Sequence, residues 1–386
     1  MPERIIPYGR QGIDDTDVDA VVAVLRSDWL TQGPAIPRFE SELAARCGAA
    51  QAVAVCNATA ALHVSCLALG VGPGDRVWTS PNTFVASANA ARLCGAEIDF
   101  VDIDPRSYNM CVEALAAKLR DGESTGRLPK VVVPVHFAGQ ACDMRGISAL
   151  ADDYGFAVLE DAAHALGGEY AGDPIGSCRY ADIAILSFHP VKIVTTGEGG
   201  AALTNDLEIA ERLRLLRSHG ITRDATCFQR PSDGPWYYEQ TALGLNYRLT
   251  DIQAALGSSQ LARLPEFIAR RRAIAARYDR ELASLQLVRP WQHADGVSAY
   301  HLYPVRIPGK PGRRQVFDAL RASGVGVNVH YIPVHTQPYY QAMGFISGDF
   351  PVAESFYEEA ISLPIYPALS DEEQSHVIGA LRRALE

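Results

Sequence analysis

One pattern leaves few folds open to this chain: short apolar runs alternate regularly with longer helical patterns through its first two-thirds. The apolar runs are rich in β-branched residues and typical of strands; they are Ala52–Val55, Arg76–Thr79, Ile98–Ile103, Lys130–His136, Ala157–Leu159 and Ile183–Phe188. Small and apolar residues recur at helical spacing between them, over Ala58–Ala68, Val85–Leu93, Val112–Leu119 and Met144–Tyr154. Because parallel strands need long crossovers, usually helices, this alternation predicts a mostly parallel α/β sheet with helices on both faces.

The pattern changes after residue 250. The elements predicted there are a long helix over Asp251–Asp279, a strand at His301–Ile307, a helix near Gln315–Ala322, a strand at Val325–Tyr331 and a final helix. We therefore expect a large α/β domain over residues 1–250, and a bridging helix with a smaller α+β domain over residues 251–386. Stretches rich in Gly, Pro and polar residues predict surface loops at Asp121–Pro129 and Pro231–Trp236.

The composition argues against several classes of protein. A net charge of -10 is dispersed along the chain, so nucleic-acid binding is not expected, and the short cluster Arg270–Arg272 is interpreted as a solvated helix face. The start Met1–Arg10 has no apolar run behind a basic segment, and nowhere do about eighteen apolar residues follow one another, so we expect a soluble, cytoplasmic protein. Eight cysteines without a C-x-x-C pair predict buried, reduced thiols and no metal site.

The most informative lysine is Lys192, which follows the predicted strand Ile183–Phe188 and precedes the Gly-rich segment Thr195–Gly200. A lysine at the carboxyl edge of an α/β sheet can form an imine with an aldehyde. Taken alone, a lysine after a strand is more often a solvated loop residue.

A second apolar strand delivers an acid to the same edge, in the run Leu159-Glu160-Asp161-Ala162-Ala163. A carboxylate there can keep a ring nitrogen protonated, as pyridoxal phosphate chemistry requires. Strand alternation and the small residues that follow favour Asp161 over Glu160. The alternative interpretation is a helix N-cap, which is common for Asp after a strand.

Three further segments carry residues suited to the same cofactor. Ala58 and Thr59 open a helix, where backbone N–H groups and a hydroxyl can bind a phosphate, and Ser187 offers another donor. Phe84 can stack on a pyridine ring. An ordinary N-cap and a core aromatic residue remain the alternatives.

The order and spacing of these motifs resemble the fold-type I sugar aminotransferases of the DegT/DnrJ/EryC1/StrS family. The matching motifs are Asn57-Ala58-Thr59-Ala60-Ala61-Leu62, Asn82-Thr83-Phe84-Val85, Glu160-Asp161-Ala162-Ala163-His164, and Ser187-Phe188-His189-Pro190-Val191-Lys192 followed by Thr195-Thr196-Gly197-Glu198-Gly199-Gly200. The resemblance implies that Lys192 carries pyridoxal 5'-phosphate as a Schiff base, Asp161 pairs with its ring nitrogen and Phe84 stacks on the ring. Thr59 and Ser187 would hold the phosphate, with Ala58 and His164 in the cofactor site.

The segment Gly244-Leu245-Asn246-Tyr247-Arg248 is similar to a family segment whose Asn reaches the cofactor phosphate of the partner subunit. The resemblance therefore implies a homodimer with shared active sites, in which Asn246 acts across the interface. A capping loop before the bridging helix is the alternative.

Several other segments resemble the branch of the family that serves pseudaminic acid biosynthesis, among them Ser27–Pro34 and Asn328–His335. That branch implies amination of carbon 4 of a UDP-linked 4-keto-6-deoxy-N-acetylhexosamine, with glutamate as donor. By the same resemblance the substrate pocket is lined by Tyr8, Trp29, Leu30, His330 and Tyr331. For His330 and Tyr331 the end of a core strand is the alternative. The sequence departs from many family members at His164, where they carry Gln.

Other functions of this fold remain as alternatives. Related sugar dehydratases carry His in place of the cofactor lysine, which Lys192 disfavours. An aminotransferase for another nucleotide-linked keto sugar and a non-catalytic regulatory member of the fold are the remaining candidates.

Overall fold

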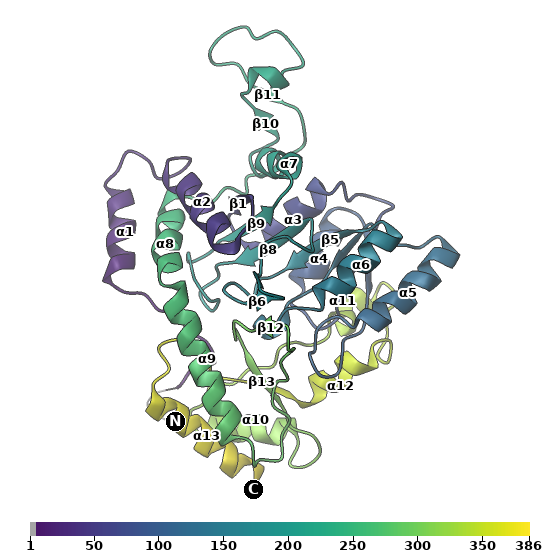
Figure 1. The fold of residues 1–386 in the computed structure, drawn as a ribbon, viewed down its shortest axis with the longest axis vertical. Helices are drawn as coiled ribbons and strands as arrows, with labels where there is room; N and C mark the ends of the chain where they lie inside the picture. Colours follow the sequence, from purple (N-terminus) through teal and green to yellow (C-terminus); the bar gives the residue numbers. More distant parts are fainter. Residues whose placement is uncertain (1–4) are drawn as a thin grey trace.

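The computed structural model describes residues 5–386, so the first four residues of the predicted large domain lie outside it. Its centre is a seven-stranded sheet in the order β1-β9-β8-β5-β4-β2-β3 (Figure 1). The strands are β1 (Gln51–Val55), β2 (Arg76–Thr79), β3 (Glu97–Phe100), β4 (Val131–Val133), β5 (Ala157–Asp161), β8 (Ile183–Ser187) and β9 (Gly200–Thr204). Neighbours pair in parallel from β3 to β8, whereas β9 is antiparallel to both β8 and β1. The predicted α/β sheet is confirmed, with β9 as an unpredicted strand.

Helices cover both faces of the sheet, and each face has its own buried core. The helices of this part are α2 (Ala35–Cys47), α3 (Ala58–Ala68), α4 (Ala86–Leu93), α5 (Val112–Thr125), α6 (Met144–Tyr154) and α7 (Leu207–Arg217). Neighbouring residues of one strand serve opposite cores: Trp78 of β2 lies in one buried cluster and Val77 in the other. The loop predicted from Asp121 is wrong in its first part, because α5 continues to Thr125 and ends where Gly126 turns left-handed at φ 68°.

A third core lies among the C-terminal elements. These are α9 (Leu264–Glu281), β13 (Tyr303–Arg306), α10 (Arg313–Ala322), β14 (Ala360–Leu363) and α13 (Asp371–Leu385). Helix α8 (Asp251–Ala262), which precedes them, packs against α2 and buries its apolar residues in a core of the large sheet. The single long helix predicted from Asp251 is wrong: it divides at Arg263, and Pro265 occupies the first turn of α9, where its missing N–H costs nothing. The division of the chain into two domains at residue 250 stays a prediction.

The strand predicted at Val325–Tyr331 is also wrong. Only isolated bridges form there, from Val325 to Ile6 and from Asn328 to Ser362. The ladder partner of β13 is instead β14, which the sequence did not indicate. The segment is therefore largely free of sheet pairing.

The expected solvated face at Arg270–Arg272 needs correction. Arg271 is only 1% exposed, and its Nη1 donates to the backbone carbonyls of Tyr300 and Ile365 at 3.2 and 3.0 Å. It thus ties α9 to the loop before β13 and to the segment after β14. All eight cysteines are free thiols. Five of them are buried as predicted, whereas Cys56 and Cys111 are half-buried and Cys227 is exposed because it lies in a projecting arm.

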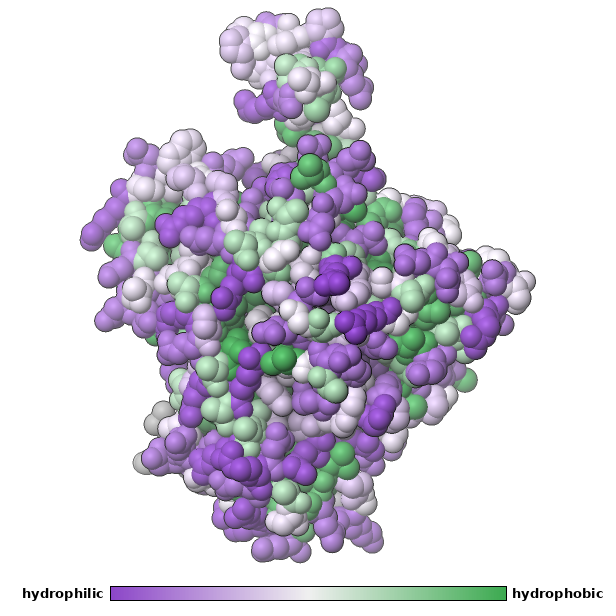
Figure 2. All heavy atoms as spheres, in the orientation of Figure 1, coloured by the Kyte–Doolittle hydropathy of each residue, from purple (hydrophilic) through white to green (hydrophobic). Residues whose placement is uncertain are grey.

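The arm leaves the body after α7 and returns before α8; it stands apart in Figures 1 and 2. It contains β10 (Ile221–Thr222), a 3-10 turn at Ala225–Cys227 and β11 (Glu239–Gln240), and the predicted loop at Pro231–Trp236 forms part of its tip. The remaining short elements are β6 (Glu169–Tyr170), β7 (Asp173–Pro174), β12 (Gly296–Val297), α11 (Pro338–Gln341), α12 (Pro351–Glu359) and 3-10 turns at Phe137–Gly139 and Val334–Thr336.

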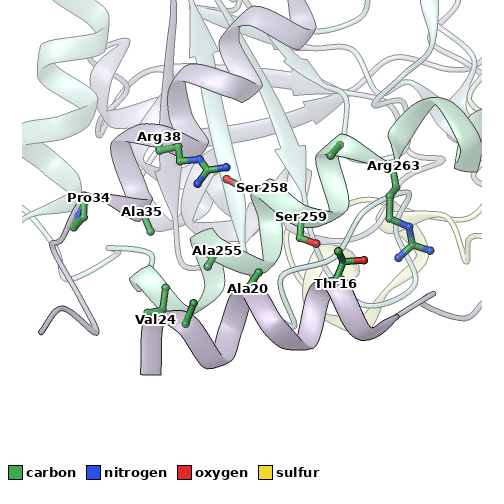
Figure 3. Close-up of a pocket in the computed structure, with 12 residues that line it drawn as sticks. Thr16, Ala20, Val24, Pro34, Ala35, Arg38, Ala255, Ser258, Ser259 and Arg263 are labelled. Atoms are coloured by element: carbon green, nitrogen blue, oxygen red, sulfur yellow. The ribbon is translucent and has the colours of Figure 1, made fainter. Parts of the chain in front are cut away.

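Helix α1 (Asp15–Leu25) packs along α8 at the edge of the molecule. A hollow of about 590 Å³ lies beside them. Figure 3 shows residues that line it, with Ala20 and Val24 on α1 and Ala255 and Ser258 on α8. Among residues 5–386, no helix is both long enough and apolar enough to cross a membrane.

Candidate active site

Polar and titratable side chains meet in a cavity of about 580 Å³, at the edge of the sheet where β5 and β8 end. The carboxyl ends of parallel strands leave a crevice between the loops that follow, and α/β proteins bind ligands there. Of the residues predicted from sequence, the cavity brings together Tyr8, Ala58, Thr59, Phe84, Asp161, His164, Ser187, Lys192, His330 and Tyr331. The hollow of Figure 3 is lined by none of them.

Lys192 lies five positions beyond the end of β8, in a tight turn. Its backbone N–H donates to the carbonyl of His189 at 2.8 Å. Burial lowers the pKa of the Lys192 amine to about 8, and the negative charge of Asp161 opposes this shift. The neutral, nucleophilic amine is therefore far more accessible near pH 7 than in an ordinary lysine.

Asp161 ends β5 and is 5% exposed. Its Oδ2 accepts a hydrogen bond from Ser87 at 2.7 Å, and its Oδ1 accepts one from the backbone of Ala163 at 3.1 Å. Burial raises the pKa of Asp161, while the bonds from Ser87 and Ala163 and the charge of Lys192 oppose the rise. A carboxylate offers about four lone-pair positions, so Asp161 can accept a further N–H from a bound ring.

The neighbouring acid, Glu160, lies on the opposite face of β5. Its Oε1 is 3.0 Å from Nε2 of His136, and both side chains are buried. Glu160 does not line the cavity, as strand alternation requires when Asp161 does.

The N-terminus of α3 forms the next wall. Asn57 caps the helix by accepting from Ala60 at 2.8 Å, which leaves the N–H groups of Ala58 and Thr59 in the turn where a helix offers no acceptor. The backbone of Gly200 passes so close that a Cβ there would lie 2.6 Å from the Ala58 nitrogen. Ser187 pairs with Gly200 across β8 and β9, at the same edge. Free N–H groups, two hydroxyls and the positive end of a helix dipole fit a phosphate.

Aromatic side chains close the remaining side. The ring of Phe84, 58% exposed, lies 6.2 Å from that of Tyr331, so one of its faces is open to a flat ligand. His330 is held through both ring nitrogens, Nδ1 to Ser362 at 2.8 Å and Nε2 to the amide of Asn328 at 3.4 Å. Burial and the charge of Lys192 lower the pKa of His330 to about 3. This imidazole is therefore neutral, and because both of its ring nitrogens are bonded within the protein, the ring forms a fixed wall of the cavity.

Three predicted residues do not line the cavity of their own chain. Trp29 and Leu30 are 54% and 48% exposed in the loop after α1, and Asn246 is exposed before α8. The carbonyl of Leu30 accepts from the backbone of Asp251 at 3.0 Å, which holds this loop at the start of α8. Their predicted roles stay predictions.

The cavity also contains residues to which the sequence assigned no role, notably Ser87, His189, Glu198 and Asn328. Ser87 is 74 positions from its partner Asp161 and had no local signal, because only the packing of α4 against the sheet brings the two together. Asn328 did have a local signal, since it begins the segment Asn328–His335, which resembles one branch of the family.

Comparison with known proteins gives a consistent result. The model of the DegT/DnrJ/EryC1/StrS aminotransferase family matches residues 11–382. The spore coat polysaccharide biosynthesis protein SpsC of Bacillus subtilis (strain 168) is 42% identical over 385 residues, which cover 98% of this chain and 97% of SpsC.

Solved structures agree with the sequence relatives. Helicobacter pylori PseC, described as an aminotransferase involved in the biosynthesis of pseudoaminic acid, superposes with a TM-score of 0.90 at 30% identity over 99% of both chains. The PLP-form of the putative sugar aminotransferase Spr1654 from Streptococcus pneumoniae gives 0.88 at 30% identity over 99% of this chain and 100% of the other. The chain therefore belongs to the DegT/DnrJ/EryC1/StrS aminotransferase family and is a sugar aminotransferase that uses pyridoxal phosphate.

Proposed function

We propose that this enzyme transfers an amino group to carbon 4 of a UDP-linked 4-keto-6-deoxy-N-acetylhexosamine, with glutamate as the donor, in pseudaminic acid biosynthesis. The observation that carries the proposal is that Lys192 and Asp161 line the same cavity as Tyr8, His330 and Tyr331. The likeness to PseC over 99% of both chains supports the choice of sugar. A cytoplasmic location stays a prediction from the sequence.

Pyridoxal phosphate, when bound, supplies the aldehyde that takes up the amino group and the ring that stores electrons. Lys192 is the residue that would hold it covalently, and its amine, with a pKa of about 8, can also take up and return the proton at the reacting sugar carbon. Asp161 would keep the ring nitrogen protonated. Ala58, Thr59 and Ser187 would bind the phosphate.

The remaining side chains would orient and enclose the sugar. Phe84 would cover one face of the ring. Tyr8 would contact sugar hydroxyls, and His330, whose ring lies 5.3 Å from that of Tyr8, would pack beside the sugar. Fixing both reactants against Lys192 removes the entropy cost of bringing them together during the reaction.

We further propose a homodimer with shared sites. Exposed apolar side chains concentrate in one N-terminal segment, with Val18, Leu25, Trp29 and Leu30 each about half exposed. Such a concentration is typical of a subunit interface. Asn246 is exposed too and would reach the phosphate bound by the partner subunit, while Trp29 and Leu30 would complete its substrate pocket.

The test is a matrix of substrates and donors. UDP-linked and dTDP-linked 4-keto-6-deoxy sugars, with and without the N-acetyl group, are each incubated with glutamate, glutamine or alanine, and kcat/KM for amine formation is measured. We expect the UDP-linked N-acetyl sugar with glutamate to exceed every other pair by at least about tenfold.

One finding favours a second substrate. SpsC, at 42% identity, is described as a spore coat polysaccharide biosynthesis protein, so another nucleotide-linked keto sugar is the alternative. A preference for a dTDP-linked sugar in the matrix would replace the proposed substrate with this one.

A further inference from the structure

His164 follows β5 and is 5% exposed. Its Nδ1 lies 3.3 Å from the backbone nitrogen of Ala138. A backbone N–H can only donate, so Nδ1 must present a lone pair and cannot carry a proton. The backbone of Ala138 thereby excludes the imidazole tautomer that carries its proton on Nδ1.

Burial and the charge of Lys192 hold the pKa of His164 well below its usual range. The ring is thus neutral and keeps one proton, which must be on Nε2. That nitrogen is 3.1 Å from the hydroxyl oxygen of Tyr331. His164 therefore donates to Tyr331, and the Tyr331 oxygen accepts.

A hydroxyl that accepts from one side keeps its own proton for another partner. Burial raises the pKa of Tyr331, so the phenol retains that proton. Both Tyr331 and His164 line the cavity that contains Lys192. Since the nitrogen of His164 already carries a hydrogen, the Tyr331 proton can only point elsewhere, into the space where a ligand binds.

We propose that His164 is a positioning residue that turns the hydroxyl proton of Tyr331 into the cavity, so that Tyr331 donates to an acceptor oxygen of the bound sugar. This inference rests on the proposed function for the identity of the sugar. Tyr331 then requires an acceptor oxygen on the ligand, because a buried donor left without an acceptor weakens binding. With the opposite tautomer, Tyr331 would donate to His164 and present a lone pair to the ligand instead.

The first measurement is independent of turnover. In protein labelled with ¹⁵N-histidine, the two-bond correlations of the His164 ring report its tautomer, with His164→Gln used for assignment. We expect the Nε2–H form. The Nδ1–H form or a charged ring would overturn the proposal, whatever substrates the enzyme accepts.

The second measurement tests whether His164 acts through Tyr331. Tyr331→Phe should raise the KM for the UDP-linked 4-keto-6-deoxy-N-acetylhexosamine about tenfold, the effect of one lost hydrogen bond. His164→Leu should also raise KM, and the double variant should be no worse than Tyr331→Phe alone. His164→Gln, whose amide can both accept from Ala138 and donate to Tyr331, should restore KM. Additive effects, or no rescue by Gln, would refute the coupling.

A matched control and a spectrum separate the remaining interpretations. Tyr278→Phe also removes a buried hydroxyl, bonded to the carbonyl of Pro364 at 2.9 Å in the C-terminal core, and should leave KM unchanged. The absorbance of the cofactor-loaded enzyme without sugar should be the same in Tyr331→Phe and wild type. A shift would place the acceptor on the cofactor and overturn its assignment to the sugar. If the wild type aminates no UDP-linked sugar, the proposed function fails on its own.

Discussion

Replacing Asp161 with Asn should shift the pH dependence of cofactor uptake to lower pH and at the same time slow turnover. Asp161 and Lys192 affect each other's charge. Burial lowers the pKa of Lys192 to about 8, and the negative charge of Asp161 keeps this pKa from falling further. Uptake of pyridoxal phosphate needs the neutral amine of Lys192. Removal of the charge therefore favours uptake near neutrality, although the same change deprives the ring nitrogen of its counter-ion.

The size of the effect follows from the pKa of Lys192. With a pKa of about 8, about one molecule in ten carries the neutral amine at pH 7, against about one in three thousand at the ordinary value of 10.5. The rate of uptake by wild-type protein should rise about tenfold per pH unit below pH 8 and level off above it. In Asp161→Asn the midpoint should lie below that of the wild type, and turnover should fall on the order of a hundredfold.

The assay is stopped-flow absorbance of cofactor-free protein mixed with excess pyridoxal phosphate between pH 6 and 10, with turnover measured in parallel. Asp173→Asn is the control, because Asp173 does not line the cavity and its carboxylate pairs with Arg179 at 2.8 Å. The midpoint of cofactor uptake in this variant should match that of the wild type. A wild-type midpoint near 10.5, or an Asp161→Asn midpoint at or above the wild-type value, would refute the electrostatic coupling of Asp161 and Lys192.

Three further outcomes are expected. Lys192→Ala should fold, as judged by circular dichroism, yet lose all measurable amination; near-normal rates would remove Lys192 from the mechanism. Mixing Lys192→Ala with Asn246→Asp, both inactive alone, should restore about a quarter of wild-type activity through heterodimers with one intact site, whereas no recovery would reject a cross-subunit Asn246. Gly200→Ala should weaken cofactor binding in an absorbance titration by about tenfold or more, because the new Cβ would lie 2.6 Å from the Ala58 nitrogen; Gly72→Ala, with nothing within 4 Å, should bind normally.

Local patterns predicted the sheet but not all of its members. Six strands were predicted because β-branched runs are buried on both faces, as at Val131–Val133. The strand β9 was missed because its residues, Gly200–Thr204, are mostly small and lack strand propensity; pairing on both sides makes it a strand. Conversely, the β-branched segment Val325–Tyr331 has the propensity but only isolated bridges.

The candidate site likewise has features that local sequence predicted and features that it did not. The position of Lys192 after one strand and of Asp161 at the end of another could be read locally, because parallel strands deliver their carboxyl ends to one edge. The exposure of Trp29, Leu30 and Asn246 could not be predicted from local sequence, since it depends on which surfaces the folded subunit leaves uncovered. Their predicted roles remain predictions until the assembly is measured.

The sequence by itself determined the α/β class, the family and the residues that carry the motifs, because propensity, periodicity and motif order are properties of short segments. Only the tertiary structure decided how those residues are charged and oriented. Ser87 reaches Asp161 across 74 positions, Ala138 fixes the proton of His164, and burial sets the pKa of Lys192 at about 8. Each of these depends on distant segments meeting in a space from which water is largely excluded, where a single hydrogen bond or charge has a large effect.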